Sequence, residues 1–160
     1  MRKYLYAIAA AGIAAMLHIQ PVMAQGDDDD DDDDAPQAGQ TTQITRSSQD
    51  LPELILGSAD DAFTVNQTDF ELVAGQAYRW KITSQGDLEY KFFTDLFRNV
   101  WMNQIVIEEL EVHMNGAPAW LEFDAHGTIQ VQFIAARPGF HSWHVADLEG
   151  RGMKGTIVIK

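Results

Sequence analysis

Hydrophobic and polar residues alternate with a period of two along most of the chain from residue 51 onward. Tyr78, Trp80 and Ile82, for example, alternate with Arg79 and Lys81. Because successive side chains of a strand point to opposite faces, such a run predicts a β-strand with one buried face. The other segments with strand character are residues 69–73, 88–92, 105–113, 119–123, 129–133, 140–145 and 156–160.

Short strands separated by Gly, Asn and Asp turns predict an all-β fold, a Greek-key β-sandwich or barrel. Residues 94–101 interrupt the alternation, because the apolar residues Leu96, Phe97 and Val100 follow helical spacing. Thr94 stands where a residue that caps a helix N-terminus is expected. We therefore expect one short helical insertion between two strands.

The first 24 residues predict a secretory signal peptide. Arg2 and Lys3 precede an apolar segment, residues 5–17, and Val22-Met23-Ala24 matches a signal-peptidase site. A membrane-spanning helix needs about 20 apolar residues, so this segment is too short for a span. No second apolar stretch reaches that length. We expect cleavage after Ala24, export to a bacterial periplasm, and no membrane span once the signal is removed.

Residues 25–50 predict an acidic, disordered leader, and residues 51–160 a single domain. The leader is rich in Asp, Gln, Thr, Ser and Gly and includes eight consecutive aspartates at 27–34, so it has almost nothing to bury. The aspartate run is interpreted as a solubilising spacer, or alternatively as a weak cation site. Eight mutually repelling carboxylates do not make a preorganised cage, which favours the spacer.

Charge narrows the classes of partner. The formal net charge is -13; residues 27–34 supply eight negative charges and Arg2 and Lys3 two positive ones, which leaves -7 for the rest. An acidic surface of this kind argues against nucleic acid and favours basic proteins or metal ions. No nucleophile elbow, phosphate loop or HExxH motif occurs, so we expect a binding protein and not an enzyme.

The last 24 residues, RPGFHSWHVADLEGRGMKGTIVIK, resemble the C-terminal copper loop of the cupredoxins, the azurin and plastocyanin type. In that family the loop carries a Cys, a His and a Met that bind copper. The ending MKGTIVIK is most similar to azurin-type members. In that register Met153 takes the axial methionine position, Glu149 the histidine position and His144 the cysteine position. The family's earlier histidine corresponds to the region of Glu89 or Tyr90.

The resemblance implies a cupredoxin-like sandwich, but the protein contains no cysteine. A blue type 1 copper site needs a short thiolate bond, and the dinuclear copper site needs two bridging thiolates. Both are excluded. If Phe140 faces the core, then His144 faces it too, by the period-two rule. His144 and Met153 would then converge on a copper ion, preferentially Cu(I), with Glu149 or Tyr90 completing a Cu(II) site.

Two functions follow from these residues. The first is an exported copper carrier or buffer with a non-blue, cysteine-free site formed by His144, Met153, Glu149 and Tyr90. The alternative is that His144 and Met153 only pack against their neighbours in a metal-free interaction module. That module would bind a periplasmic partner protein through an aromatic patch, for which Phe93, Phe97 and Trp101 are the candidates.

Overall fold

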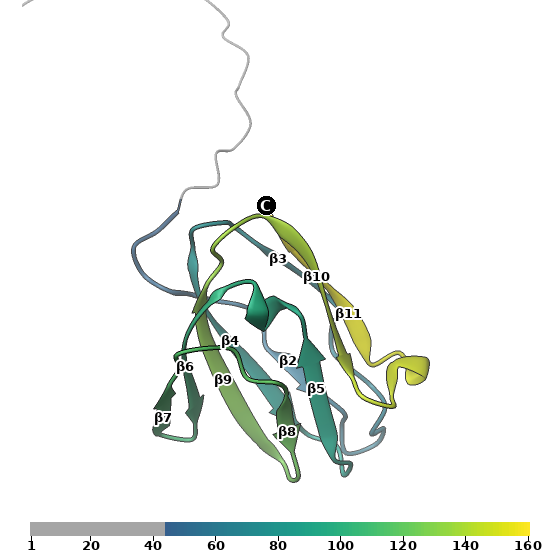
Figure 1. Ribbon diagram of the computed structural model, residues 1–160. Coiled ribbons are helices and arrows are strands. Elements are labelled where there is room, and N and C mark those ends of the chain that lie inside the picture. Colours follow the sequence, from purple (N-terminus) through teal and green to yellow (C-terminus); the bar gives the residue numbers. More distant parts are fainter. Residues whose placement is uncertain (1–43) are drawn as a thin grey trace, which may run out of the picture. The chain divides into compact units, whose positions relative to one another are not determined.

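The computed structural model describes residues 44–160, which form two β-sheets packed face to face (Figure 1). The predicted all-β sandwich is confirmed. The predicted signal peptide, residues 1–24, and residues 25–43 of the predicted leader lie outside the described residues. No helix in the described part of the chain has the length and apolar character needed to cross a membrane.

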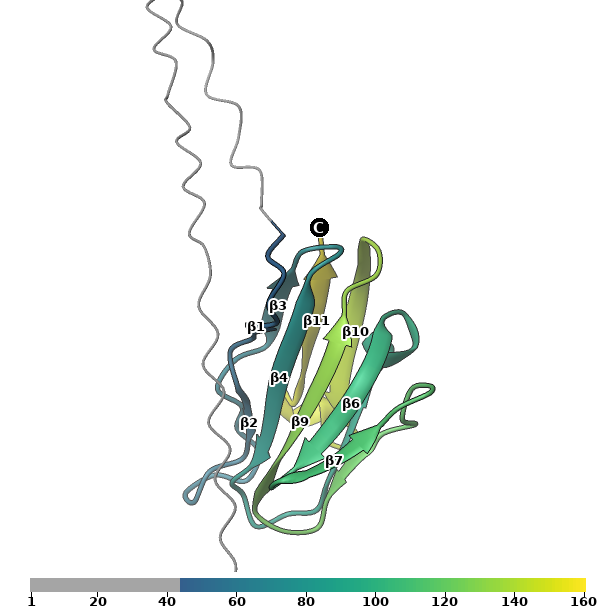
Figure 2. The ribbon, with the colours of Figure 1, turned by 90° about the vertical axis from the view of Figure 1, so that its left-hand side faces the viewer.

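Sheet A has six strands in the order β1-β4-β9-β6-β7, with β2 also paired to β4. Its strands are β1 (Gln49–Asp50), β2 (Leu54–Leu56), β4 (Ala77–Ser84), β6 (Trp101–Ile107), β7 (Leu110–His113) and β9 (Gly127–Ile134). Both β1 and β2 run parallel to β4 and form one edge of the sheet, whereas β7 forms the other (Figure 2).

Sheet B has five strands in the order β3-β11-β10-β5-β8. They are β3 (Asp69–Leu72), β5 (Tyr90–Thr94), β8 (Leu121–Phe123), β10 (Gly139–Val145) and β11 (Lys154–Ile159). The long hairpin of β10 and β11 contains the C-terminal loop, whose only regular element is the 3₁₀ turn η2 (Glu149–Arg151).

Aromatic side chains join the two sheets. Trp80 of β4 is fully buried and packs edge-on against Phe70 of β3 and Phe92 of β5, at centroid distances of 4.8 and 5.7 Å. The period-two pattern of β4 placed Trp80 on the buried face, together with Tyr78 and Ile82. Burial of large rings dominates the stability of such a core, because each removes a large apolar area from water.

Several sequence-based boundaries differ from the structure, and two of these differences change an element. Gln49 and Asp50, assigned above to the leader, form β1, which pairs with β4. Residues 105–113 are not one strand: a turn at Glu108, whose φ is 56°, divides them between β6 and β7. Neither glutamate of this turn is a usual turn signal, which is why the sequence conceals it. The predicted helix is confirmed as one 3₁₀ turn, η1 (Leu96–Arg98).

Candidate functional site

Strand β10 positions the predicted site, and its alternation is opposite to the one expected. Phe140 is 86% exposed, whereas Trp143 and Val145 are buried in the core. Because side chains alternate along a strand, Ser142 and His144 share the outer face with Phe140. The expectation that Phe140 and His144 face the core is therefore wrong, and His144 lies on the outer face of sheet B.

Met153 lies on the other side of this sheet. It is fully buried, and its carbonyl accepts a hydrogen bond from the Val145 amide at 2.9 Å. The adjacent pair of the same ladder is His144 opposite Lys154. Met153 thus shares the inner face with Val145 and not with His144. The structure does not bring the two predicted copper ligands together.

The residues that do accompany Met153 are apolar. Val145 lies between Met153 and Phe92, which is its register partner on β5. All three are completely buried. Leu148, whose carbonyl is 3.3 Å from the Met153 amide, packs against the same core. We call Phe92, Val145 and Met153 the inner row. A thioether alone cannot hold copper, and these neighbours offer no nitrogen, oxygen or thiolate donor. The copper implied by the fold does not fit here.

Tyr90 also faces the core, but its hydroxyl makes a structural hydrogen bond to a different part of the chain. Its hydroxyl donates a 2.8 Å hydrogen bond to the Ala62 carbonyl. A Cβ added to Gly57 or Gly86 would lie about 2 Å from that hydroxyl oxygen, so both positions require glycine. Burial, together with the negative charges of Asp87 and Asp61, raises the pKa of Tyr90. The hydroxyl therefore stays protonated and acts as a structural donor.

His144 and Glu149 are the one pair of predicted ligands that meet. The His144 Nε2 and Glu149 Oε1 atoms are 3.5 Å apart, and the two side chains are 40% and 41% exposed. Glu149 opens the η2 turn, which returns the loop beside the end of β10. An exposed pair of this kind contributes little to stability, because solvent screens the charges.

A row of stacked rings crosses the outer face of sheet B at His144. The imidazole stacks on Phe93 of β5 at 5.5 Å and 7°, and Phe93 stacks on Trp120 at 5.7 Å and 28°. Phe93 is the register partner of His144, so the row crosses β10 and β5 to the segment before β8. We call His144, Phe93 and Trp120 the outer row. Trp120 remains 45% exposed.

The polar ends of the outer row are also held. The Trp120 Nε1 donates to Glu122 at 2.8 Å, and this hydrogen bond lowers the pKa of Glu122. Two open hollows adjoin His144. One of about 230 Å³ lies towards Phe93, and a second of about 590 Å³ lies towards Glu149 and β11. The part of the imidazole that Phe93 does not cover is therefore accessible from these hollows.

The predicted aromatic patch of Phe93, Phe97 and Trp101 does not exist as such. Phe97 is 2% exposed and packs near Phe92, at a centroid distance of 6.3 Å. Phe93 belongs to the outer row on sheet B, whereas Trp101 begins β6 of sheet A and is 72% exposed. Helical spacing grouped these rings, but the segment continues as strands on both sides of one 3₁₀ turn.

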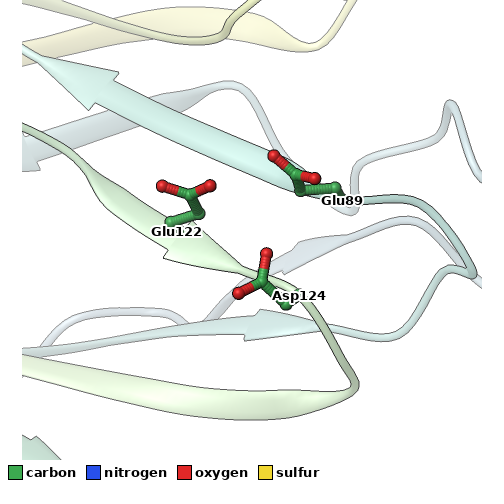
Figure 3. A group of neighbouring side chains, drawn as sticks. All are labelled: Glu89, Glu122 and Asp124. Carbon is green, nitrogen blue, oxygen red and sulfur yellow. The ribbon is translucent and has the colours of Figure 1, made fainter.

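Three carboxylates gather near the outer row. Glu89, Glu122 and Asp124 present oxygens within 4.8 Å of one another at the ends of β5 and β8 (Figure 3). All three are exposed, and Lys91 lies 2.6 Å from Glu89 and 3.4 Å from Glu122. The single ammonium group offsets one of the three negative charges, and the exposed cluster gives no further indication of a metal site.

Sequence reasoning missed Val145 and Trp120, and it grouped Phe93 with the wrong neighbours. Trp143 and Val145 are apolar while Ser142 and His144 are polar, which is a usable signal for the correct face. Phe140 outweighed it, although it stands at the strand end. The outer row depends on the register of β10 against β5, which no local pattern specifies.

Solved structures of several copper proteins share this fold. A multicopper oxidase from Aquifex aeolicus matches with a TM-score of 0.57 and 12% identity over 74% of this chain and 31% of the oxidase. A multicopper oxidase from Campylobacter jejuni matches with a TM-score of 0.53 and 9% identity, over 74% and 31% of the two chains. The copper-containing nitrite reductase from Thermus scotoductus gives 0.52 and 11%, over 69% and 30%.

This chain therefore spans about a third of the length of those enzymes. No protein-family model matches the sequence, and none of the curated proteins does. At identities this low, the structural matches show the fold alone. That fold is the cupredoxin fold, which the C-terminal loop also indicated.

Proposed function

We propose that this cupredoxin-like domain is a metal-free binding module, which presents the outer row to a basic partner protein. The observation that carries the proposal is the inner row. Phe92, Val145 and Met153 are fully buried beside one another, where a copper ion held by Met153 would need donor atoms. The loop keeps the frame of a copper loop, while apolar packing replaces the metal.

The apolar inner row has a physical advantage over a metal. Burying side chains such as Val, Phe and Met stabilises a fold by roughly 1.5–3 kcal/mol each, and needs no cofactor. A copper site, by contrast, holds deprotonated ligands that are costly to bury when the metal is absent. We propose that the loop's role in this protein is to fix the β10–β11 hairpin, which in turn positions the outer face.

The outer row supplies a contact surface of the kind that proteins use. Stacked rings form a rigid, partly apolar surface, and Trp is enriched among the residues that dominate binding energy. The Trp120 ring is also a surface on which a cationic side chain of a partner can lie. Each hollow beside His144 is lined by one acidic and one basic side chain, Asp95 and Arg98 in the first and Glu149 and Lys154 in the second, which would orient a partner.

The net negative charge of the domain favours a basic partner. The chain outside residues 27–34 and the signal peptide carries a formal charge of -7. Such a field accelerates association with positively charged proteins and slows association with acidic ones. Binding, and not catalysis, is the activity that this arrangement of an apolar interior and an aromatic surface supports.

Export to the periplasm is part of the proposal. It rests on the signal-peptide pattern of residues 1–24. Mass analysis of the protein recovered from the periplasm of its host should give a chain that begins at Gln25. Recovery from the cytoplasm with Met1 intact would contradict it.

A defined pair of peptides tests the module. One is Arg-rich and contains Phe, and the other has Glu in place of each Arg. We expect the basic peptide to shift the amide resonances of Phe93, Trp120 and His144, and the acidic peptide to leave them unchanged. Trp120→Ala should weaken this binding at least about tenfold, since loss of a dominant contact costs about 1–2 kcal/mol or more. Trp101→Ala, an exposed Trp of sheet A, is the matched control.

A second candidate function is copper binding on the surface, through the His144–Glu149 pair. The 3.5 Å approach of these two exposed side chains favours it. Titration with Cu(II) and Cu(I), monitored by calorimetry, separates the candidates. If the wild type binds one equivalent and His144→Ala/Glu149→Ala binds none, the domain is a copper protein and the metal-free proposal fails. Equal, weak uptake by both proteins removes this second candidate.

A further inference from the structure

Strand β7 is the terminal strand of sheet A, and its outer edge has no strand beside it among residues 44–160 (Figure 1). All four of its residues are exposed, Leu110 and Val112 by 73% and 51%. A sheet edge with free amide and carbonyl groups is a template for another strand. Natural edges are commonly protected by Lys, Pro or a bulge, and the sequence Leu-Glu-Val-His has none of these within β7.

The apolar residues of β7 belong to the face of sheet A that elsewhere forms the core. Val112 is the register partner of Ile105, which is 8% exposed and packs in the core. Leu110 is the partner of Ile107 and lies two residues from Val112, so it shares that face. Ile107 is itself 45% exposed. The inner face of sheet A thus extends, uncovered, beyond the strands that sheet B packs against it.

The opposite face of β7 is charged. Glu111 receives a 3.1 Å hydrogen bond from the Gln104 side chain, and the His113 Nε2 lies 3.5 Å from a Glu111 oxygen. Glu111 and His113 are 53% and 70% exposed. Glu111 and His113 are two residues apart on the same face. In an antiparallel pair of two β7 strands, the acidic group of one strand can therefore lie opposite the basic group of the other.

Register then selects the occupant. When two copies of β7 pair edge to edge about a two-fold axis, their inner faces lie on the same side of the joined sheet. Residues directly opposite each other must then belong to the same face, so the axis passes through a residue and not between residues. An axis at Glu111 places two glutamates opposite each other, and an axis at His113 two histidines. An axis at Val112 places Val112 opposite its own copy and makes two Glu111–His113 pairs. Like charges directly opposite are destabilising, and opposite charges stabilise.

We propose that the protein forms a two-fold homodimer in which β7 pairs antiparallel with β7 of a second copy, centred on Val112. The two A sheets become one continuous sheet, and the stripes of Ile107, Leu110 and Val112 from the two copies adjoin. This surface lies on sheet A and the outer row on sheet B. A result that contradicts the dimer therefore leaves the proposed partner binding untouched, and the reverse also holds.

Sedimentation equilibrium of the purified protein, at concentrations up to about 1 mM, tests the dimer. We expect concentration-dependent dimers that dissociate more readily at low salt, because two acidic domains repel each other. Val112→Lys should abolish dimers, whereas Phe140→Lys, at an exposed Phe on sheet B, should not. A wild type that stays monomeric throughout overturns the proposal, as does equal dimerisation of Val112→Lys.

Charge exchange tests the register. His113→Glu places like charges opposite one another twice, and Glu111→Lys replaces the carboxylate opposite each His113 with a lysine, so each should raise the dissociation constant about tenfold. In a mixture of the two variants, the introduced lysine faces the introduced glutamate, and the native His113 of one copy faces the native Glu111 of the other. The mixture should therefore restore association through heterodimers. Circular dichroism melts confirm that each variant is folded. Dimers that survive both single changes, or no recovery in the mixture, would show that β7 does not pair in this register.

Discussion

The inner and outer rows cross the same two strands, β10 and β5, at consecutive positions, and they have opposite characters. The inner row of Phe92, Val145 and Met153 is fully buried and apolar. The outer row of His144, Phe93 and Trp120 is accessible and adjoins carboxylates. A shift of one residue along a strand exchanges these environments. A loop that resembles a copper loop in sequence can therefore have an interior that belongs to the core and polar residues that belong to the surface.

A matched pair of substitutions, one in each row, should give the largest difference in unfolding free energy. Val145→Asn removes apolar burial and leaves an amide without partners in the inner row, at a cost of about 3–4 kcal/mol in unfolding free energy. His144→Asn, one residue away, should cost about 1 kcal/mol or less, since it loses only a partly exposed stack. Urea unfolding measures both. Similar costs would mean that the two rows are not distinct.

Met153 separates packing from ligation. Met153→Ala leaves a cavity in the core and should destabilise the domain by about 2–5 kcal/mol. Met153→Leu conserves volume and should cost less than about 1.5 kcal/mol. Thermal unfolding with and without copper measures both. A large loss in Met153→Leu that appears only with copper present would indicate ligation by the thioether.

Tyr90 tests how the inner face responds to pH. Its pKa is raised in the folded protein, so the phenol contributes stability below its unfolded value of about 10. That contribution is lost as the pH rises through the folded pKa. Tyr90→Phe should cost about 1–2 kcal/mol near neutral pH, because the Ala62 carbonyl loses its donor. It should also flatten the decline in stability above about pH 10, followed by denaturant unfolding. An unchanged decline would assign the alkaline sensitivity to other groups.

The same contrast explains what the sequence could and could not predict. Alternation identified most strands and the buried Trp80, because burial of one face is a local signal. The C-terminal resemblance identified the fold. The prediction of which face of β10 is buried rested on Phe140, but this residue shares the exposed outer face with Ser142 and His144 despite its hydrophobicity. The pairings of His144 with Phe93 and of Val145 with Phe92 join residues about 50 positions apart, and only tertiary register determines them.

The smallest expected effect concerns the outer end of the outer row. Trp120→Ala removes the stack on Phe93 and should lower stability by about 0.5–1.5 kcal/mol. It also removes the hydrogen bond that lowers the pKa of Glu122. The pKa of that carboxyl should therefore rise towards its ordinary value, although the neighbouring Lys91 still holds it partly down. Carbon-detected NMR titration of the Glu122 side chain measures this rise.

Trp101→Ala is the control for this titration, since Trp101 is an exposed Trp on sheet A. It should leave the Glu122 titration unchanged. A shift of equal size in both variants would mean that Glu122 senses the whole domain. A shift in Trp120→Ala alone would show that the outer row holds its polar edge in place without any ligand, as a preorganised binding surface requires.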